Sequence, residues 1–300
     1  MNPPPAAPAI AFAAGVLGIA LFSGMDAIMK GLVLAIGVYS TMLWRSFAGV
    51  SMAGIGYGLS WKRWPEPQVL RIHVERGVLT SFMGLLFFWG IGYVPLAQAI
   101  ALAFIAPLIA LYLAAVLLGE QVGKRTLAGS LLAFTGVIVI FLGQARADLG
   151  REALLGSVAI LLSAVLYAIN IIMMRRQSQA AGPLEIAFFQ NLTVTAVLLL
   201  ALPVIGTTLP ALEHWPDLLG AAMLSTLSLL LLSWAYARAE ASYLATTEYT
   251  AFLWAALFGW LVFGEQLSGF TVAGAVLIVA GCLLAARSPQ AANPHLEAAA

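Results

Sequence analysis

Almost all of this 300-residue chain consists of apolar segments, each 18 to 25 residues long. An α-helix rises 1.5 Å per residue, so about 20 apolar residues are needed to cross the roughly 30 Å hydrocarbon core of a bilayer. Turn sequences such as Trp64-Pro65-Glu66-Pro67 and Gly182-Pro183 separate the segments. We predict ten transmembrane helices, over residues 9–33, 37–60, 72–93, 95–118, 126–143, 153–174, 184–205, 217–238, 241–263 and 268–286.

The composition agrees with a membrane protein. Hydrophobic residues make up 62% of the chain and charged residues only 9%, whereas soluble domains carry about 25% charged residues. A soluble enzyme, a nucleic-acid-binding protein and a disordered chain are therefore excluded. The single cysteine, Cys282, rules out an internal disulfide and a thiolate metal site, and no phosphate-binding loop or His/Cys cluster is present. We expect an all-α polytopic membrane protein that is not an enzyme and uses no metal or cofactor.

The distribution of Lys and Arg predicts the orientation, because cytoplasmic loops carry an excess of both residues. With a cytoplasmic N-terminus, the ten predicted helices place ten basic residues on the inner side and three on the outer side. We therefore expect both termini in the cytoplasm and a bacterial inner (plasma) membrane location. The inner residues are Lys62, Arg63, Arg71, Arg76, Lys124, Arg125, Arg175, Arg176, Arg238 and Arg287; the outer ones are Lys30, Arg146 and Arg151.

The chain contains an internal repeat. Gly119-Glu120-Gln121 recurs as Gly264-Glu265-Gln266, and at this offset of 145 residues, 8 of the 18 positions from 119 to 136 are identical. Each half then holds five predicted helices, an odd number, so the second half enters the membrane inverted. Inverted repeats are typical of secondary transporters, although a duplicated structural bundle is an alternative. We predict a first repeat over 1–147, a second over 148–288, and a polar tail over 289–300 that could be a cloning remnant.

A segment of the first repeat points to a family. It runs from Pro95 to Leu108 and continues at Gly119-Glu120, Gly129 and Gly136-Val137. It resembles the EamA-type repeat of the drug/metabolite transporter (DMT) superfamily, and the overall pattern is similar to its aromatic amino-acid exporter (YddG-type) branch. The second repeat departs from the pattern at Glu240-Ala241-Ser242 and at Phe252. The resemblance implies ten helices around a central substrate cavity, with both termini cytoplasmic.

Three charged residues lie within or beside the first two predicted helices. Asp26 and Lys30 are four residues apart and share a helix face, and Arg45 lies at a depth similar to that of Asp26. We predict an Asp26–Arg45 contact, with Lys30 nearer water. These residues would form a gate or a site for the carboxylate and ammonium of a substrate; alternatively, they form an ion pair that pins two helices.

The candidate cavity residues are aromatic or polar side chains within predicted helices, a lining that suits a flat, partly apolar solute. Glu248 could hold a substrate amino group or carry a proton, or it could simply be paired. Pro107 should bend its helix and could act as a hinge. The cavity candidates are Phe82, Trp89, Gln98, Tyr167, Asn170, Trp234, Tyr243, Glu248 and Tyr249.

Other repeated residues predict structural roles. Glu120 and Glu265 end their helices in both repeats, and we expect each carboxylate to accept hydrogen bonds from the N-terminus of the following helix. Gly129, Gly136 and Gly143 recur every seven residues, as do Gly274 and Gly281. Small residues on one face allow helices to approach closely, so helices 126–143 and 268–286 are predicted to be packing elements.

Together these patterns predict a secondary or facilitative carrier that exports small metabolites by alternating access. The resemblance favours aromatic and other neutral amino acids as substrates. Efflux of cationic drugs is the main alternative, and a membrane scaffold or a lipid-modifying enzyme is less favoured. The expected partners are a small-molecule substrate and the lipid bilayer, with no nucleic acid, and the sequence allows a monomer.

Overall fold

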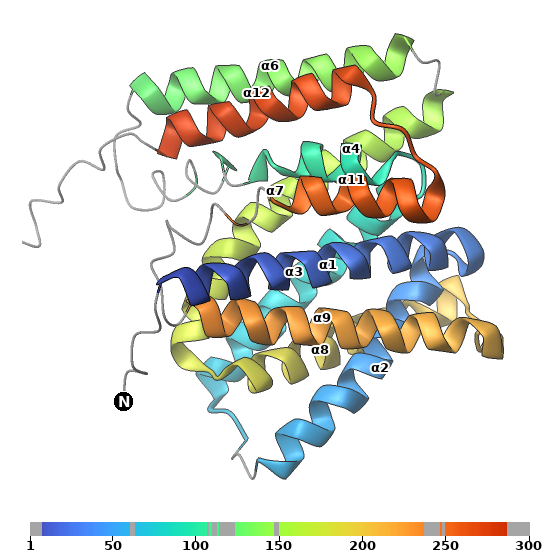
Figure 1. Ribbon diagram of the computed structural model, residues 1–300. Coiled ribbons are helices and arrows are strands. Elements are labelled where there is room, and N and C mark those ends of the chain that lie inside the picture. The colour runs from blue at the N-terminus through green and yellow to red at the C-terminus, as the bar shows by residue number, and fades with distance from the viewer. Residues whose placement is uncertain are drawn as a thin grey trace, which may run out of the picture.

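The computed structural model describes residues 8–60, 64–106, 108–109, 113, 124–146, 150–236, 247 and 250–286. These residues form helices joined by turns (Figure 1). The helices are α1 (Pro8–Ile36), α2 (Val38–Leu59), α3 (Pro67–Ile91), α4 (Leu96–Ala103), α6 (Lys124–Arg146), α7 (Gly150–Ala180), α8 (Pro183–Ile205), the short 3₁₀ helix η1 (Leu212–His214), α9 (Trp215–Tyr236), α11 (Thr250–Phe263) and α12 (Gly269–Ala286).

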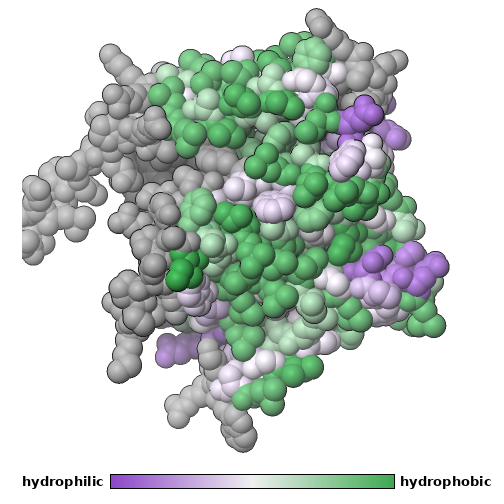
Figure 2. All heavy atoms as spheres, in the orientation of Figure 1, coloured by the Kyte–Doolittle hydropathy of each residue, from purple (hydrophilic) through white to green (hydrophobic). Residues whose placement is uncertain are grey.

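The predicted all-helical fold is confirmed for the described part of the chain. Five of its helical stretches are long and apolar enough to cross a membrane: Ile10–Ile36, Pro67–Ile91, Gly150–Met174, Pro183–Ile205 and Leu212–Leu232. Shorter apolar helices cover Leu131–Gly143, Thr250–Phe263 and Gly269–Gly281. Apolar side chains cover most of the described face in Figure 2, as expected of a surface that faces lipid. The full count of ten spans stays a prediction.

The helix predicted over 95–118 requires a correction. Helix α4 ends at Ala103, Phe104 and Ile105 form a turn, and residues 106, 108–109 and 113 are helical again, so the predicted helix is interrupted. The sequence explains this early end, because a proline at position 107 has no N–H to donate to the carbonyl of Ala103. Pro107 itself lies outside the described residues, so its role as a hinge stays a prediction.

The helices pack mainly in pairs. Helix α1 packs against α9, α3 against α7, and α2 against α8, while α4 packs against α11 (Figure 1). Helices α6 and α12 form an antiparallel pair that lies along one side of the molecule (Figure 1). The prediction that these two helices are packing elements is therefore confirmed.

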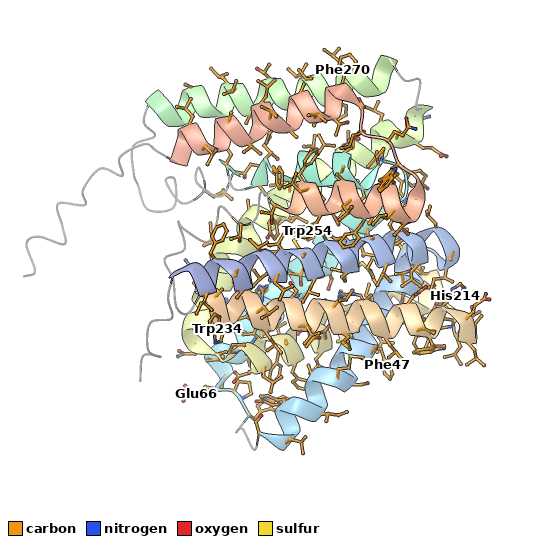
Figure 3. All side chains as sticks on the ribbon, in the orientation of Figure 1. Phe47, Glu66, His214, Trp234, Trp254 and Phe270 are labelled. Carbon is orange, nitrogen blue, oxygen red and sulfur yellow. The ribbon has the colours of Figure 1, made fainter. Side chains whose placement is uncertain are left out.

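Glycines permit the close approach of α6 and α12. A Cβ atom added at Gly136 would lie 2.6 Å from the carbonyl oxygen of Gly274, and one added at Gly143 would lie 2.5 Å from Cβ of Phe270, whose place at the start of α12 is labelled in Figure 3. A Cβ atom at Gly281 would meet the backbone of Gly129. The regular spacing of these glycines thus lets two backbones touch, which is how small residues promote helix association in membranes.

We expect Gly136→Ala to lower the free energy of unfolding by about 1–3 kcal/mol, because the methyl group forces two backbones apart. Thermal unfolding of the purified protein in detergent would measure the effect. Gly269→Ala is the matched control, since no atom of the described residues lies within 4 Å of a Cβ atom added there. Equal melting temperatures for the two variants would contradict this account of the α6–α12 pair.

Candidate functional site

Asp26 and Arg45 lie at similar depths on neighbouring helices. Asp26 lies ten residues before the end of α1 and Arg45 seven residues after the start of α2, which places them about 15 Å and about 10 Å from those adjacent helix ends. Asp26 is only 1% exposed, and its Oδ1 atom has no hydrogen-bond partner among the described residues. A buried carboxylate oxygen without a partner is costly, and such groups mark functional sites in membrane proteins.

Arg45 turns toward α9 rather than toward Asp26. Its Nη1 atom donates a hydrogen bond to Oγ of Ser225 (3.3 Å), whereas its buried Nε atom has no partner in the described part of the chain. The predicted Asp26–Arg45 contact is therefore wrong as an ion pair, because a hydroxyl on α9 has taken the place of the carboxylate. The two charges still interact electrostatically. They form an open pair, held near each other without direct contact.

Aromatic residues of α11 face α1 on the N-terminal side of Asp26: a Cβ atom added at Gly24 would lie 3.7 Å from the ring of Phe258, and Trp254 lies about one turn earlier on α11. Trp254 lies nine residues before the end of α11, about 14 Å along that helix, and α11 packs against α1. Figure 3 labels Trp254 between these two helices. Its indole Nε1 atom is buried and has no partner within the described residues. Helices α1, α2 and α9 thus bring a carboxylate, a guanidinium and a hydroxyl to similar depths, and α11 adds the ring of Phe258 near them and an indole about one turn further along.

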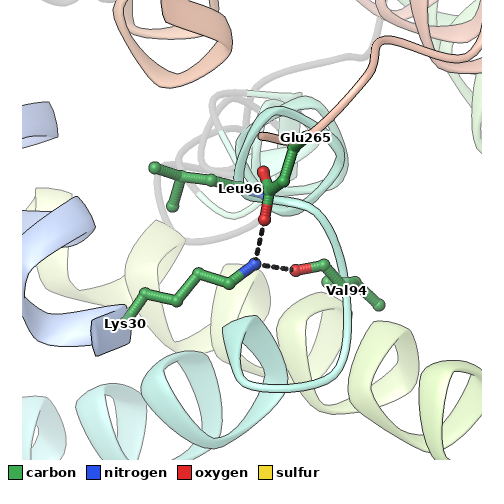
Figure 4. A network of polar contacts seen from close by, with 4 residues as sticks. All are labelled: Lys30, Val94, Leu96 and Glu265. Atoms are coloured by element: carbon green, nitrogen blue, oxygen red, sulfur yellow. Dashed lines mark hydrogen bonds and ion pairs between the residues drawn. The ribbon is translucent and has the colours of Figure 1, made fainter. Parts of the chain in front are cut away.

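Lys30 does not lie nearer water as predicted. It is 6% exposed, and its ammonium group forms an ion pair with Glu265 (Figure 4). Its Nζ atom also donates a hydrogen bond to the carbonyl oxygen of Val94 (2.7 Å) and lies 5.2 Å from the ring centroid of Phe263. The correction follows from burial, since a lysine inside an apolar protein needs a carboxylate partner.

Glu265 caps a helix, but not the one predicted. Its Oε2 atom accepts a hydrogen bond from the backbone N–H of Leu96 (2.7 Å), the first residue of α4 (Figure 4). The following helix, α12, is capped instead by the hydroxyl of Ser268. Glu265 can turn back because Gly264 has a positive φ of 64° and because Gly259 leaves room for the carboxylate. Glu120 lies outside the described residues.

The Lys30–Glu265 pair and its two backbone bonds form what we call the terminal latch, made of Lys30, Val94, Leu96 and Glu265. The latch ties the end of α1 and the α3–α4 turn to the end of α11. In sequence, its charged members are 235 residues apart. The latch therefore holds an element of the predicted first repeat against an element of the second.

The predicted cavity residues have varied surroundings. Trp89 packs at a tilt against Tyr93, with ring centroids 4.9 Å apart, and Phe82 is 56% exposed. Gln98 is buried, with an Nε2 atom that has no partner among the described residues. Trp234, labelled in Figure 3, packs beside Ala235 and the start of α1. Tyr243, Glu248 and Tyr249 lie outside the described residues, so their roles stay predictions.

Tyr167 and Asn170 lie beside a residue that the sequence analysis missed. Arg76, counted above as a residue of the inner side, is 6% exposed within α3, and its Nε atom donates a hydrogen bond to Oδ1 of Asn170 (2.8 Å). The phenol of Tyr167 interacts electrostatically with the same guanidinium. The sequence could have identified Arg76 as a candidate. It falls inside the predicted helix 72–93 and lies three residues from His73, on the same face.

One hollow is lined by residues other than these candidates. It is an apolar groove of about 400 Å³ between α4, α11 and α12, with Leu253 and Val276 exposed in its wall. Such a wall matches the lipid-facing surface. The predicted central cavity stays a prediction.

Apolar helices long enough to span a membrane, with charged side chains buried between them, are typical of polytopic membrane transporters. The chain belongs to the EamA-like transporter family, whose sequence profile matches residues 9–142 and 154–287. The resemblance noted from the Pro95–Leu108 segment is thereby confirmed. The relatives are bacterial, and the protein is a multi-pass transporter of the DMT superfamily.

Several characterised proteins are similar to this chain. The pseudopaline exporter CntI of Pseudomonas aeruginosa (strain UCBPP-PA14) is 28% identical over 279 residues, which cover 91% of this chain and 94% of the exporter. A riboflavin transporter of Rhizobium johnstonii is 30% identical, covering 72% of this chain and 70% of that protein. A protein of known crystal structure shares the fold, with a TM-score of 0.63, 21% identity, and coverage of 93% of this chain and 98% of its own.

We expect Lys30→Met to destabilise the protein by about 3–5 kcal/mol, because Glu265 is left as a buried charge without a partner. Glu265→Gln should cost a similar amount, and the double variant should cost less than the sum of the two. Melting temperatures of the wild type, the two single variants and the double variant, measured in detergent, complete this double-mutant cycle. Arg71→Met is the control, since Arg71 pairs with Glu75 on the surface and exposed pairs contribute at most about 1 kcal/mol. A Lys30→Met protein as stable as Arg71→Met would refute the latch.

Proposed function

We propose that this protein exports small metabolites with a zwitterionic head group, foremost neutral and aromatic amino acids, as a secondary or facilitative carrier. The open pair of Asp26 and Arg45 carries this proposal. An amino acid would place its ammonium on the free Oδ1 atom of Asp26 and its carboxylate on the Nε atom of Arg45. Both buried groups would then gain charge-assisted hydrogen bonds, and the bound complex would add no net charge to the membrane interior.

The aromatic preference rests on the ring of Phe258, which lies beside Gly24, two residues before Asp26, and on the indole of Trp254 one turn further along α11, with the two ring centroids 6.5 Å apart. Aromatic faces favour flat solutes. Two kinds of relatives lend support to this proposal. CntI exports a metabolite, pseudopaline, and the riboflavin transporters carry a flat solute. Riboflavin itself is the second candidate substrate, and it would use the aromatic residues without needing both charges.

We further propose that ten spans form two inverted repeats, 1–147 and 148–288, that alternate between two states. Adding 145 to the residue numbers carries α1 onto α7 and α3 onto α9. In support, the contact of α1 with α9 has its counterpart in the contact of α7 with α3. The two matches of the family profile, to 9–142 and 154–287, have the same layout.

The terminal latch fits a gate in this scheme. It joins helix ends that the distribution of basic residues places on the outer side, so it would hold the outer face closed while substrate loads from the cytoplasm. Separation of Lys30 from Glu265 would open that face. The proposed location is the bacterial inner membrane, with both termini cytoplasmic, and the functional unit is a monomer.

The test is uptake of labelled phenylalanine or tryptophan into proteoliposomes that contain the purified protein. Saturable uptake competed by neutral amino acids, but not by their carboxamides or by a cationic dye, is the expected result. Asp26→Asn and Arg45→Gln should each lower kcat/KM about 10- to 100-fold, because each removes one charge-assisted hydrogen bond.

Glu75→Gln is the control for these two variants, since Glu75 belongs to the exposed Arg71–Glu75 pair and should transport normally. If the protein takes up riboflavin but no amino acids, riboflavin replaces amino acids as the proposed substrate. If Asp26→Asn and Arg45→Gln leave uptake unchanged, the open pair is not part of the binding site.

A further inference from the structure

Arg76 is a buried cation that no carboxylate of the described residues contacts. It lies nine residues after the start of α3, about 14 Å along the helix from Pro67. Two neutral amides on α7 hold it: Nε donates to Oδ1 of Asn170 (2.8 Å) and Nη1 donates to Oε1 of Gln177 (2.5 Å). No carboxylate of the described residues forms an ion pair with Arg76, and none of them accepts a hydrogen bond from its Nη2 atom.

The nearby carboxylate of Glu185 is engaged at the far end of a directed chain of hydrogen bonds. Because Oε1 of Gln177 accepts from Arg76, the Nε2 atom of the same amide donates to Nδ1 of His73 (2.6 Å). The proton of His73 must then lie on Nε2, which donates to Oε1 of Glu185 (3.2 Å). The ring of Phe189 stacks on His73 and keeps its plane fixed, with centroids 4.8 Å apart.

This chain orients the guanidinium without neutralising it. Gln177 and His73 stand between Arg76 and Glu185, so the carboxylate does not reach Nη2. A planar guanidinium with free N–H groups and a fixed orientation is suited to bidentate binding of a carboxylate. The burial of Arg76 among amides would strengthen such a bond, because little water competes for it.

We propose that Arg76 is a second carboxylate-binding site, separate from the open pair, which receives the carboxylate of a substrate arriving from the cytoplasmic side. Arg76 lies in the half of α3 next to Pro67, whereas Arg45 lies in the opposite half of the membrane. Asn170 and Gln177 are its positioning residues, and Tyr167 lies beside the bound anion. The proposal rests on the proposed function only for the identity of the substrate, since the site itself would bind simple carboxylates.

The two arginines differ in one respect that permits a test. Arg45 interacts with the charge of Asp26, so an anion without an ammonium group is disfavoured there. Arg76 has no such neighbour in direct contact among the described residues. Phenylacetate, which carries a carboxylate and no ammonium, should therefore bind at Arg76 rather than at Arg45.

The experiment measures the melting temperature of the full-length purified protein in detergent against the concentration of phenylacetate, with phenylacetamide as the neutral reference. Binding to the folded state raises the melting temperature by mass action. We expect a saturable rise with phenylacetate in the wild type and in Arg45→Gln, and none in Arg76→Gln. Arg76→Lys, which keeps the charge but loses the planar fork, should bind about tenfold more weakly.

A rise that persists in Arg76→Gln, a rise lost in Arg45→Gln instead, or no rise in the wild type would each overturn the proposal. If Arg76→Gln fails to fold, Arg76→Lys decides, and an affinity equal to that of the wild type would count against the site. This readout needs no transport. A carboxylate site at Arg76 in a protein that moves no amino acid would thus leave this inference standing while the proposed function fails.

Discussion

A charge inside a bilayer must find its partner inside the protein, and the described structure is organised around how it does so. The terminal latch shows the fully satisfied case. The ammonium of Lys30 has a carboxylate, a carbonyl and an aromatic ring around it, and the carboxylate of Glu265 also caps α4. The desolvation cost of such a pair is recovered only when every partner is present. The latch therefore fixes the start of α4 relative to the last turns of α1 and the end of α11.

Two arginines within the helices, Arg45 and Arg76, are only partly satisfied. Arg45 has a serine hydroxyl and Arg76 has two amide oxygens, and no carboxylate of the described residues touches either guanidinium. In a transporter, an incomplete set of partners is useful, since a site that is already neutral gains little from a charged ligand. The proposed amino-acid site and the proposed inner carboxylate site follow from the same property of these two residues.

The sequence was sufficient for most of the described helices and for two of their packing elements, but not for the break after Ala103 or for the partners of the charges. Apolar length predicts spans, and the seven-residue glycine spacing predicts that α6 and α12 are packing elements, because both depend on local residue order; that the two helices pack against each other comes from the structure. Counting residues also places Asp26 and Arg45 at similar depths. It does not give the rotation of each helix, so Ser225 and Glu265, both far away in sequence, could not be identified as the partners of Arg45 and Lys30. Arg76 was missed because a basic residue near a predicted helix end was counted with the loops.

The measurement that tests the central claim most directly is an experimental structure of the protein with tryptophan bound. Our account predicts the ammonium of the ligand within hydrogen-bond distance of Oδ1 of Asp26, and its carboxylate on the guanidinium of Arg45. A structure in which Asp26 and Arg45 pair directly with each other while the ligand lies elsewhere would contradict it.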